Sequence, residues 1–381
     1  MRLLSPPSQD WAPRTAKELI AQARGYLPAY AREKENRFII HNVALLSEHP
    51  DPASVTLAFV GSSRTRFLRP RGLLGLDAVV VAGNSYNEIP YGTLVELNII
   101  RRLFPGLKTV FVEAPLLMRR SRLRLTTDHE KYLFALKELE PLRRRLPGGE
   151  ELSRFLAFHQ ANVGGFRPEL KLFRARRELQ LSELFKRLVL KRAPERAEPE
   201  RAKLAANGEY RELQGPLLAR RDWPPRIQPS SEKIWRIQGA GRDIPGDHVF
   251  ELWALWARQE GLELVFYDPP VRGDLLDVKA GLGLKSHHED LVRLSGRYGL
   301  PVVILNDSKL GYGDQWSLFS DEDHLGTCLG SLLLTTAIWD SYRDWKETGK
   351  LVHRVPLSKA LEALPRVENP CPETSLEGFG S

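Results

Sequence analysis

The stretch VTLAFVGSSRTRF, residues 55–67, places an apolar run of strand length directly before a polar turn. The run is rich in valine, leucine and phenylalanine, which favours a buried β-strand. Gly61, two serines and Arg64 follow at once. An ordinary turn is the more common explanation of such a stretch, and the alternative is a serine nucleophile held at the end of a sheet.

Four further apolar runs of strand length follow, and polar residues, glycine or proline come after each of them. The five runs are residues 55–60, 78–81, 109–112, 262–267 and 302–305. Helical patterns lie between most of these runs, at 92–104, 249–261 and 288–298, and residues 327–345 form a last helix. Strands that alternate with helices build mostly parallel sheets covered on both faces. The pattern therefore predicts an α/β fold with five mainly parallel strands.

The chain divides into four parts. An N-terminal helical segment occupies residues 1–50, and residues 51–116 and 241–351 together form the α/β domain. Residues 117–240 interrupt this domain with helical sequence rich in arginine, leucine and glutamate, and we expect a basic cap over the strand ends. Residues 352–381 are polar and contain prolines, so we expect a loosely ordered tail.

The positive charge of the protein lies almost entirely in this inserted segment. The formal net charge is +8, and residues 141–235 hold 21 Lys and Arg against 12 Asp and Glu, a balance of +9. Such a segment can attract an anionic substrate or surface, although a solvated face of arginine and glutamate explains the same charge. Nucleic acid is not an expected partner, because no nucleic-acid-binding motif accompanies the charge.

The composition indicates a cytoplasmic protein without a metal site. Two cysteines in 381 residues suit a reducing compartment and lie in no metal-ligand spacing. The N-terminus lacks the apolar core of a signal peptide, and no window approaches the roughly 20 apolar residues of a transmembrane helix. We expect His287 and His288 at the surface, since no third ligand lies near them in the sequence.

The ends of the predicted strands carry the candidate catalytic residues, because ligands bind outside the carboxyl ends of parallel strands. A serine nucleophile needs a base and an acid that orients the base. Asp321 precedes His324 by three residues, so its carboxylate can hold the Nδ1–H and leave Nε2 free as the base. A helix N-cap at Ser320 or Asp321 is the structural alternative for this motif.

Backbone amides are the candidates for stabilising the oxyanion of such a reaction. Gly61 permits a sharp turn that directs the amide of Ser63 at the reacting oxygen, and Gly83 can bring a second amide close. Asn84 and Asn87 are further candidates beside Gly83, with turn residues as their alternative role.

The order of these motifs resembles that of the SGNH hydrolase superfamily, the GDSL esterase-like proteins. Residues 61–63, Gly-Ser-Ser, are similar to the first block of the family and mark Ser63 as the nucleophile. Residues 81–85, Val-Ala-Gly-Asn-Ser, are similar to the second block, with Gly83 as an oxyanion donor. Residues 321–324 match the last block, Asp-x-x-His, with Asp321 as the orienting acid and His324 as the base.

This resemblance implies a three-layer, flavodoxin-like α/β/α sandwich with a five-stranded, mainly parallel sheet and a helical insertion. It implies a serine esterase or acyltransferase that acts on an acyl ester through a Ser-His-Asp triad and needs no cofactor. The Gly-Ser-Ser-Arg form is most similar to the branch of D-alanine transfer and polysaccharide acyl-modifying proteins, with Arg64 as a substrate-binding candidate.

One departure from the family pattern keeps another function open. The third block, Gly-x-Asn-Asp, would follow the third strand, where this chain has Glu113, Ala114 and Pro115. The oxyanion asparagine of the family is therefore missing. The alternative is a non-catalytic protein of the same fold that binds a carbohydrate, a polymer or a protein.

Overall fold

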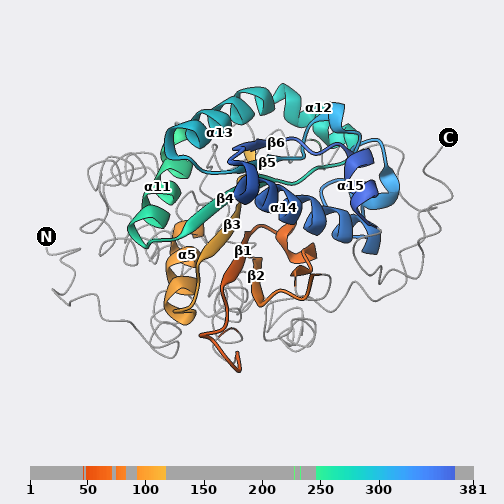
Figure 1. The fold of residues 1–381 in the computed structure, drawn as a ribbon. Coiled ribbons are helices and arrows are strands. Elements are labelled where there is room, and N and C mark those ends of the chain that lie inside the picture. Colours follow the sequence, from red (N-terminus) through yellow and green to blue (C-terminus); the bar gives the residue numbers. More distant parts are fainter. Residues whose placement is uncertain are drawn as a thin grey trace, which may run out of the picture.

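The computed structural model describes residues 46, 49–70, 74–82, 92–116, 227, 232 and 246–364. Within them, six strands form one parallel sheet in the order β2-β1-β3-β4-β5-β6 (Figure 1). The strands are β1 (Leu57–Gly61), β2 (Ala78–Ala82), β3 (Thr109–Glu113), β4 (Glu263–Asp268), β5 (Val302–Ile304) and β6 (Val352–His353). The chain order reverses beside β1, which lies between β2 and β3. Open α/β sheets bind ligands at the carboxyl side of such a switch point.

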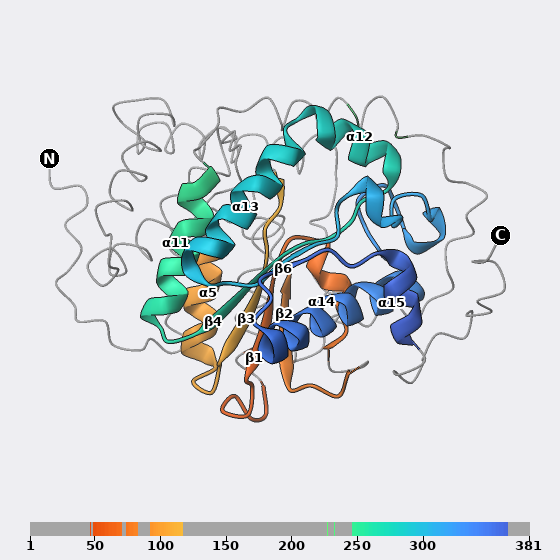
Figure 2. The ribbon, with the colours of Figure 1, turned by 45° about the horizontal axis from the view of Figure 1, so that its top comes forward.

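Helices pack on both faces of the sheet (Figure 2). One buried cluster combines β1 with α5 (Gly92–Leu103), α11 (Gly246–Gln259) and α13 (Leu284–Tyr298). The opposite cluster combines β1 with α14 (Cys328–Thr348) and α15 (Leu357–Ala363). Ala58 and Val60 belong to the first cluster, whereas Leu57 and Phe59 belong to the second, because successive strand residues point to opposite faces.

The prediction of an α/β fold with parallel strands is confirmed, and the number of strands is higher than expected. The five predicted strands begin and end within two residues of their expected bounds. The sixth strand, β6, pairs with β5 through Val302 and Val352. It lies with α15 in the segment expected to be a loose tail, of which residues 352–364 are described. The helix α12 (Gly273–Gly281) was also not predicted.

Two findings bear on the expected cellular location. Among the helices described, none combines the length and the hydropathy needed to span a bilayer. Cys328, the first residue of α14, takes part in a disulfide bond. This differs from the reduced cysteines that the sequence suggested.

Candidate active site

The chain turns sharply at the end of β1, through residues 61–65, which we call the nucleophile turn. A Cβ added to Gly61 would lie 2.0 Å from Thr65 Oγ1 and 2.5 Å from Glu113 Oε2, so only glycine fits there. The backbone N–H of Thr65 donates to the Ser62 carbonyl at 3.0 Å and closes the turn. Ser63 is half-buried.

A second turn, residues 320–326, precedes α14, and we call it the acid–base turn. Asp321 Oδ1 accepts from the backbone N–H groups of Asp323 and His324, at 2.8 and 2.9 Å. The backbone N–H of Ser320 donates to the His324 carbonyl at 2.9 Å. The N-cap of α14 is Thr327, so the alternative of a helix N-cap at Ser320 or Asp321 does not apply.

The two turns bring Ser63, His324 and Asp321 together. His324 Nε2 lies 2.7 Å from Ser63 Oγ, and His324 Nδ1 lies 2.7 Å from each carboxylate oxygen of Asp321. With the Nδ1 proton directed at Asp321, Nε2 is the acceptor for the Ser63 hydroxyl. The serine and the histidine are 261 positions apart in the chain, so the fold itself creates this contact.

Glu113, the last residue of β3, is the residue of this site that the sequence did not single out. Its side chain is fully buried, and its carboxylate accepts from the nucleophile turn. The donors are Ser62 N (2.6 Å), Ser62 Oγ (2.7 and 2.8 Å), Arg64 Nε (2.8 Å) and Thr65 Oγ1 (2.7 Å). Since the hydroxyl of Ser62 is directed at Glu113, Ser63 is the serine that faces the histidine.

A buried tyrosine extends this network behind the turn. Tyr267 OH lies 2.7 Å from Thr65 Oγ1. Because the single hydroxyl hydrogen of Thr65 points at Glu113, the tyrosine is the donor in this contact. Burial and the nearby Glu113 charge raise the pKa of Tyr267 well above its usual value, so the phenol keeps its hydrogen.

Buried ion pairs connect the nucleophile turn to the acid–base turn. Arg64 Nη2 lies 2.6 Å from Glu113 Oε1, and Arg64 Nη1 lies 3.7 Å from Asp323 Oδ1. Lys279, from α12, places its Nζ 3.2 Å from the same Asp323 oxygen.

The pKa values of these groups follow from the competition between burial and opposite charge. Burial alone lowers the pKa of Arg64 and raises that of Asp323, but the paired charges outweigh it. The pKa of Arg64 is therefore raised and that of Asp323 is lowered. For Lys279 burial prevails over the attraction of Asp323, and its pKa lies below the usual value.

The structure does not support a substrate contact for Arg64. Only 5% of its surface is exposed, and its guanidinium group faces Glu113 and Asp323. Its position makes it part of the support of the nucleophile turn. The other expected binding residues, Gly83, Asn84 and Asn87, lie outside the described residues.

His287 and His288 are both buried, so the expectation that they lie at the surface is wrong. His287 Nε2 lies 2.8 Å from the Ala114 carbonyl oxygen, and His288 Nε2 lies 2.9 Å from Asp268 Oδ2. The ends of β3 and β4 thus supply polar partners that allow both rings to be buried. The part of the chain that the structure describes contains no group of three residues that could hold a metal ion.

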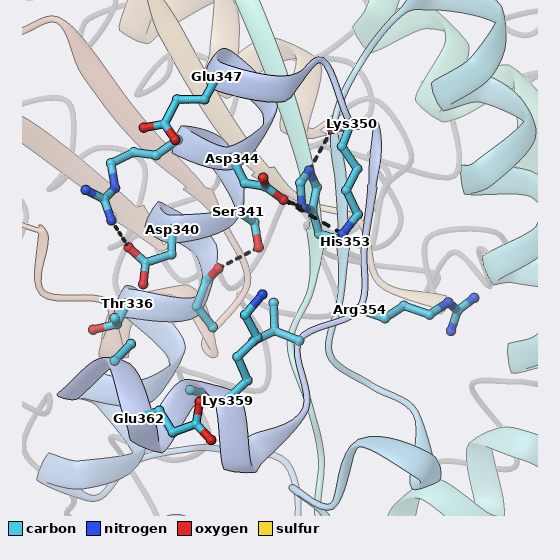
Figure 3. A pocket seen from close by; sticks show the side chains of 15 residues that line it. Thr336, Asp340, Ser341, Asp344, Glu347, Lys350, His353, Arg354, Lys359 and Glu362 are labelled. Atoms are coloured by element: carbon cyan, nitrogen blue, oxygen red, sulfur yellow. Dashed lines mark hydrogen bonds and ion pairs between the residues drawn. The ribbon is translucent and has the colours of Figure 1, made fainter.

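A pocket of about 260 Å³ lies between α14, α15 and β6 (Figure 3). Acidic and basic side chains line it together. Figure 3 shows Asp344 linked to His353 and Lys350, at 3.4 and 3.8 Å. No residue of the nucleophile turn or the acid–base turn contributes to its wall.

Comparisons with protein-family models, with curated proteins and with solved structures find no significant match to this chain. The function must therefore be inferred from the geometry of the site.

Proposed function

We propose that the protein is a serine esterase or acyltransferase of the SGNH type. One observation carries the proposal, the line of 2.7 Å contacts from Asp321 through His324 to Ser63. This arrangement activates a serine hydroxyl in unrelated hydrolases, because an oriented imidazole removes its proton. Helices on both faces of the parallel sheet are compatible with the three-layer sandwich of that superfamily.

In the proposed first step, Ser63 Oγ attacks the carbonyl carbon of an acyl ester while His324 Nε2 takes the hydroxyl proton. Asp321 stabilises the imidazolium that forms. The amides of Ser63 and Gly83 stabilise the oxyanion. The tetrahedral intermediate then collapses to an acyl-serine, and His324 gives its proton to the leaving alcohol.

In the second step, water or an acceptor hydroxyl attacks the acyl-serine. His324 takes the proton of the attacking group and returns it to Ser63 Oγ as the acyl bond breaks. This chemistry uses no metal and no organic cofactor. The basic insertion, residues 117–240, lies outside the described residues except for 227 and 232, and its charge would attract an anionic substrate or acceptor.

One observation favours a non-catalytic protein as the second candidate. Glu113 ends β3, the strand after which the family's third block with its oxyanion asparagine would follow, and its carboxylate can only accept hydrogen bonds from the turn. The site therefore lacks one side-chain donor, and the loss of such a donor costs about 100-fold or more in rate. A protein of this fold that binds a carbohydrate, a polymer or a protein would not need that donor.

Labelling with a fluorophosphonate probe separates the two candidates, because the probe reacts only with an activated serine. We expect the purified full chain to form one adduct, located on Ser63 by mass spectrometry of the peptides. Ser63→Ala should remove the adduct. Ser308→Ala is the matched control, since Ser308 is exposed and also follows a strand.

A folded wild-type chain without an adduct on Ser63 would exclude the serine esterase and acyltransferase mechanism and leave the non-catalytic candidate. An adduct on Ser63 would exclude a vestigial site and justify a screen of acyl esters. Circular dichroism of each sample establishes that the chain is folded.

A further inference from the structure

All hydrogen bonds described for the Glu113 carboxylate come from Ser62, Arg64 and Thr65, the residues that surround Ser63. Oε2 accepts from the backbone N–H of Ser62 and from the hydroxyl of Thr65. Oε1 accepts from the guanidinium group of Arg64. The carboxylate therefore holds the chain on both sides of the nucleophile.

Burial of a carboxylate is costly unless hydrogen bonds and an opposite charge compensate for it. An apolar side chain would fill the end of β3 at lower cost to the fold. Glu113 has 0% of its surface exposed, so its charge cannot serve to bind a ligand. What it does contribute is a fixed position for the residues on both sides of Ser63, through the backbone N–H of Ser62 and the side chains of Ser62, Arg64 and Thr65.

The Glu113 carboxylate is also linked, through Arg64, to the turn that carries the base His324. Arg64 binds Glu113 and approaches Asp323, the residue before His324. Lys279 holds Asp323 from the side of α12. The distance between Ser63 and His324 thus depends on a chain of charges that begins at Glu113.

We propose that Glu113 is a positioning residue, which holds the nucleophile turn so that Ser63 Oγ faces His324 Nε2. This inference rests on the proposed serine chemistry. It assigns to Glu113 a role that acts through the residues on both sides of Ser63. The reacting groups themselves remain Ser63, His324 and Asp321.

The test compares Glu113→Gln with wild type in the kinetics of fluorophosphonate labelling. An amide must direct its NH₂ group at one of the two donor sets, because both carboxylate oxygens accept hydrogen bonds. The maximal labelling rate constant, kinact, should fall about 100-fold, the order of effect of a misplacement near 1 Å. The reversible binding constant of the probe, KI, should not change, because Glu113 is buried.

Asp268→Asn is the matched control. Asp268 is also a buried carboxylate, stands at the end of the neighbouring strand β4, and bonds to His288 instead of the nucleophile turn. Its kinact should equal that of wild type. A partly unfolded sample lowers the fraction of chains that label, whereas a misplaced Ser63 lowers kinact and still labels to completion.

Thr65→Val is the second variant and serves where Glu113→Gln fails to fold. It preserves the shape of the side chain, and it removes one donor to Glu113 together with the acceptor of the Tyr267 hydroxyl. We expect kinact to fall about 10-fold, less than in Glu113→Gln, because the bonds from Ser62 and Arg64 to the carboxylate remain.

If the wild-type chain is labelled at Ser63 and kinact is unchanged in Glu113→Gln or in Thr65→Val, the positioning role is overturned. The proposed function would still stand. An equal loss in Asp268→Asn would overturn the positioning role too, because the effect would then follow from any buried charge. A wild-type chain that is not labelled at Ser63 overturns both this inference and the proposed function.

Discussion

Two histidine–aspartate pairs near the carboxyl end of the sheet differ in the ring nitrogen that binds the carboxylate and in the exposure of their side chains. His324 binds Asp321 through Nδ1 and presents Nε2 to Ser63 at 2.7 Å. His288 binds Asp268 through Nε2 at 2.9 Å. The side chains of the first pair are 15% and 33% exposed, and those of the second are 8% and 1% exposed.

A contact between histidine and aspartate therefore does not itself define a catalytic site. A base needs a free nitrogen opposite a hydroxyl and access for the substrate. His324 has both, because its Nε2 faces Ser63 Oγ and its side chain is partly exposed. His288 uses its Nε2 to satisfy a buried carboxylate, so its contact stabilises the fold.

Removal of each histidine is the strongest test of this difference. His324→Ala should lower kinact for fluorophosphonate labelling on the order of 10⁶-fold, as the loss of the base does in a serine protease. His288→Ala should leave kinact unchanged in the folded chains and lower the free energy of unfolding. Equal labelling rates in the two variants would contradict the assignment of His324 as the base.

Replacement of the orienting acid has the next largest expected effect. Asp321→Asn should lower kinact on the order of 10⁴-fold, because the amide no longer fixes the Nδ1–H tautomer of His324. The free energy of unfolding should change little, since Asp321 is partly exposed. Urea denaturation followed by tryptophan fluorescence measures this free energy. A labelling rate of Asp321→Asn equal to that of wild type would exclude an orienting role for Asp321.

The buried pair is tested through stability. Asp268→Asn should lower the free energy of unfolding by about 3 kcal/mol at neutral pH, the cost of breaking a buried pair. Burial alone raises the pKa of Asp268, but the hydrogen bond and charge of His288 outweigh burial and hold the pKa below its usual value.

The sign of the pH dependence follows from this direction. A carboxyl group with a lowered pKa stabilises the fold above its unfolded pKa, about 3.9, and loses that contribution as the pH falls through its folded pKa. The stability difference between wild type and Asp268→Asn should therefore shrink in acid. Urea denaturation at neutral pH and near pH 2.5 measures this difference in the free energy of unfolding. A difference that is the same at both pH values would show that Asp268 is not charged in the fold.

Most of the sheet could be predicted because its strands are continuous apolar runs, which is the pattern of a parallel strand buried on both faces. β6 could not be predicted in this way, since a strand of two residues carries no periodicity. The helix α12 is a short segment of nine residues, and it was missed for a similar reason.

The three residues of the candidate triad were predicted because chemistry restricts their types and the order of the motifs restricts their places. Glu113 was missed because its role depends on contacts with residues 48 to 51 positions away. The burial of His287 and His288 was missed for the same reason, since their partners are a carbonyl and a carboxylate at distant strand ends. No local pattern encodes such contacts.

The close approach of Gly61 to Glu113 has a consequence for the evolution of this protein. A methyl group at position 61 would overlap both Thr65 and Glu113, so a larger residue at position 61 demands smaller side chains at positions 65 and 113. In an alignment of relatives, positions 61, 65 and 113 should covary as a unit, because residues in contact constrain one another. A homologue that keeps the serine but has lost this trio should keep the fold and react more slowly.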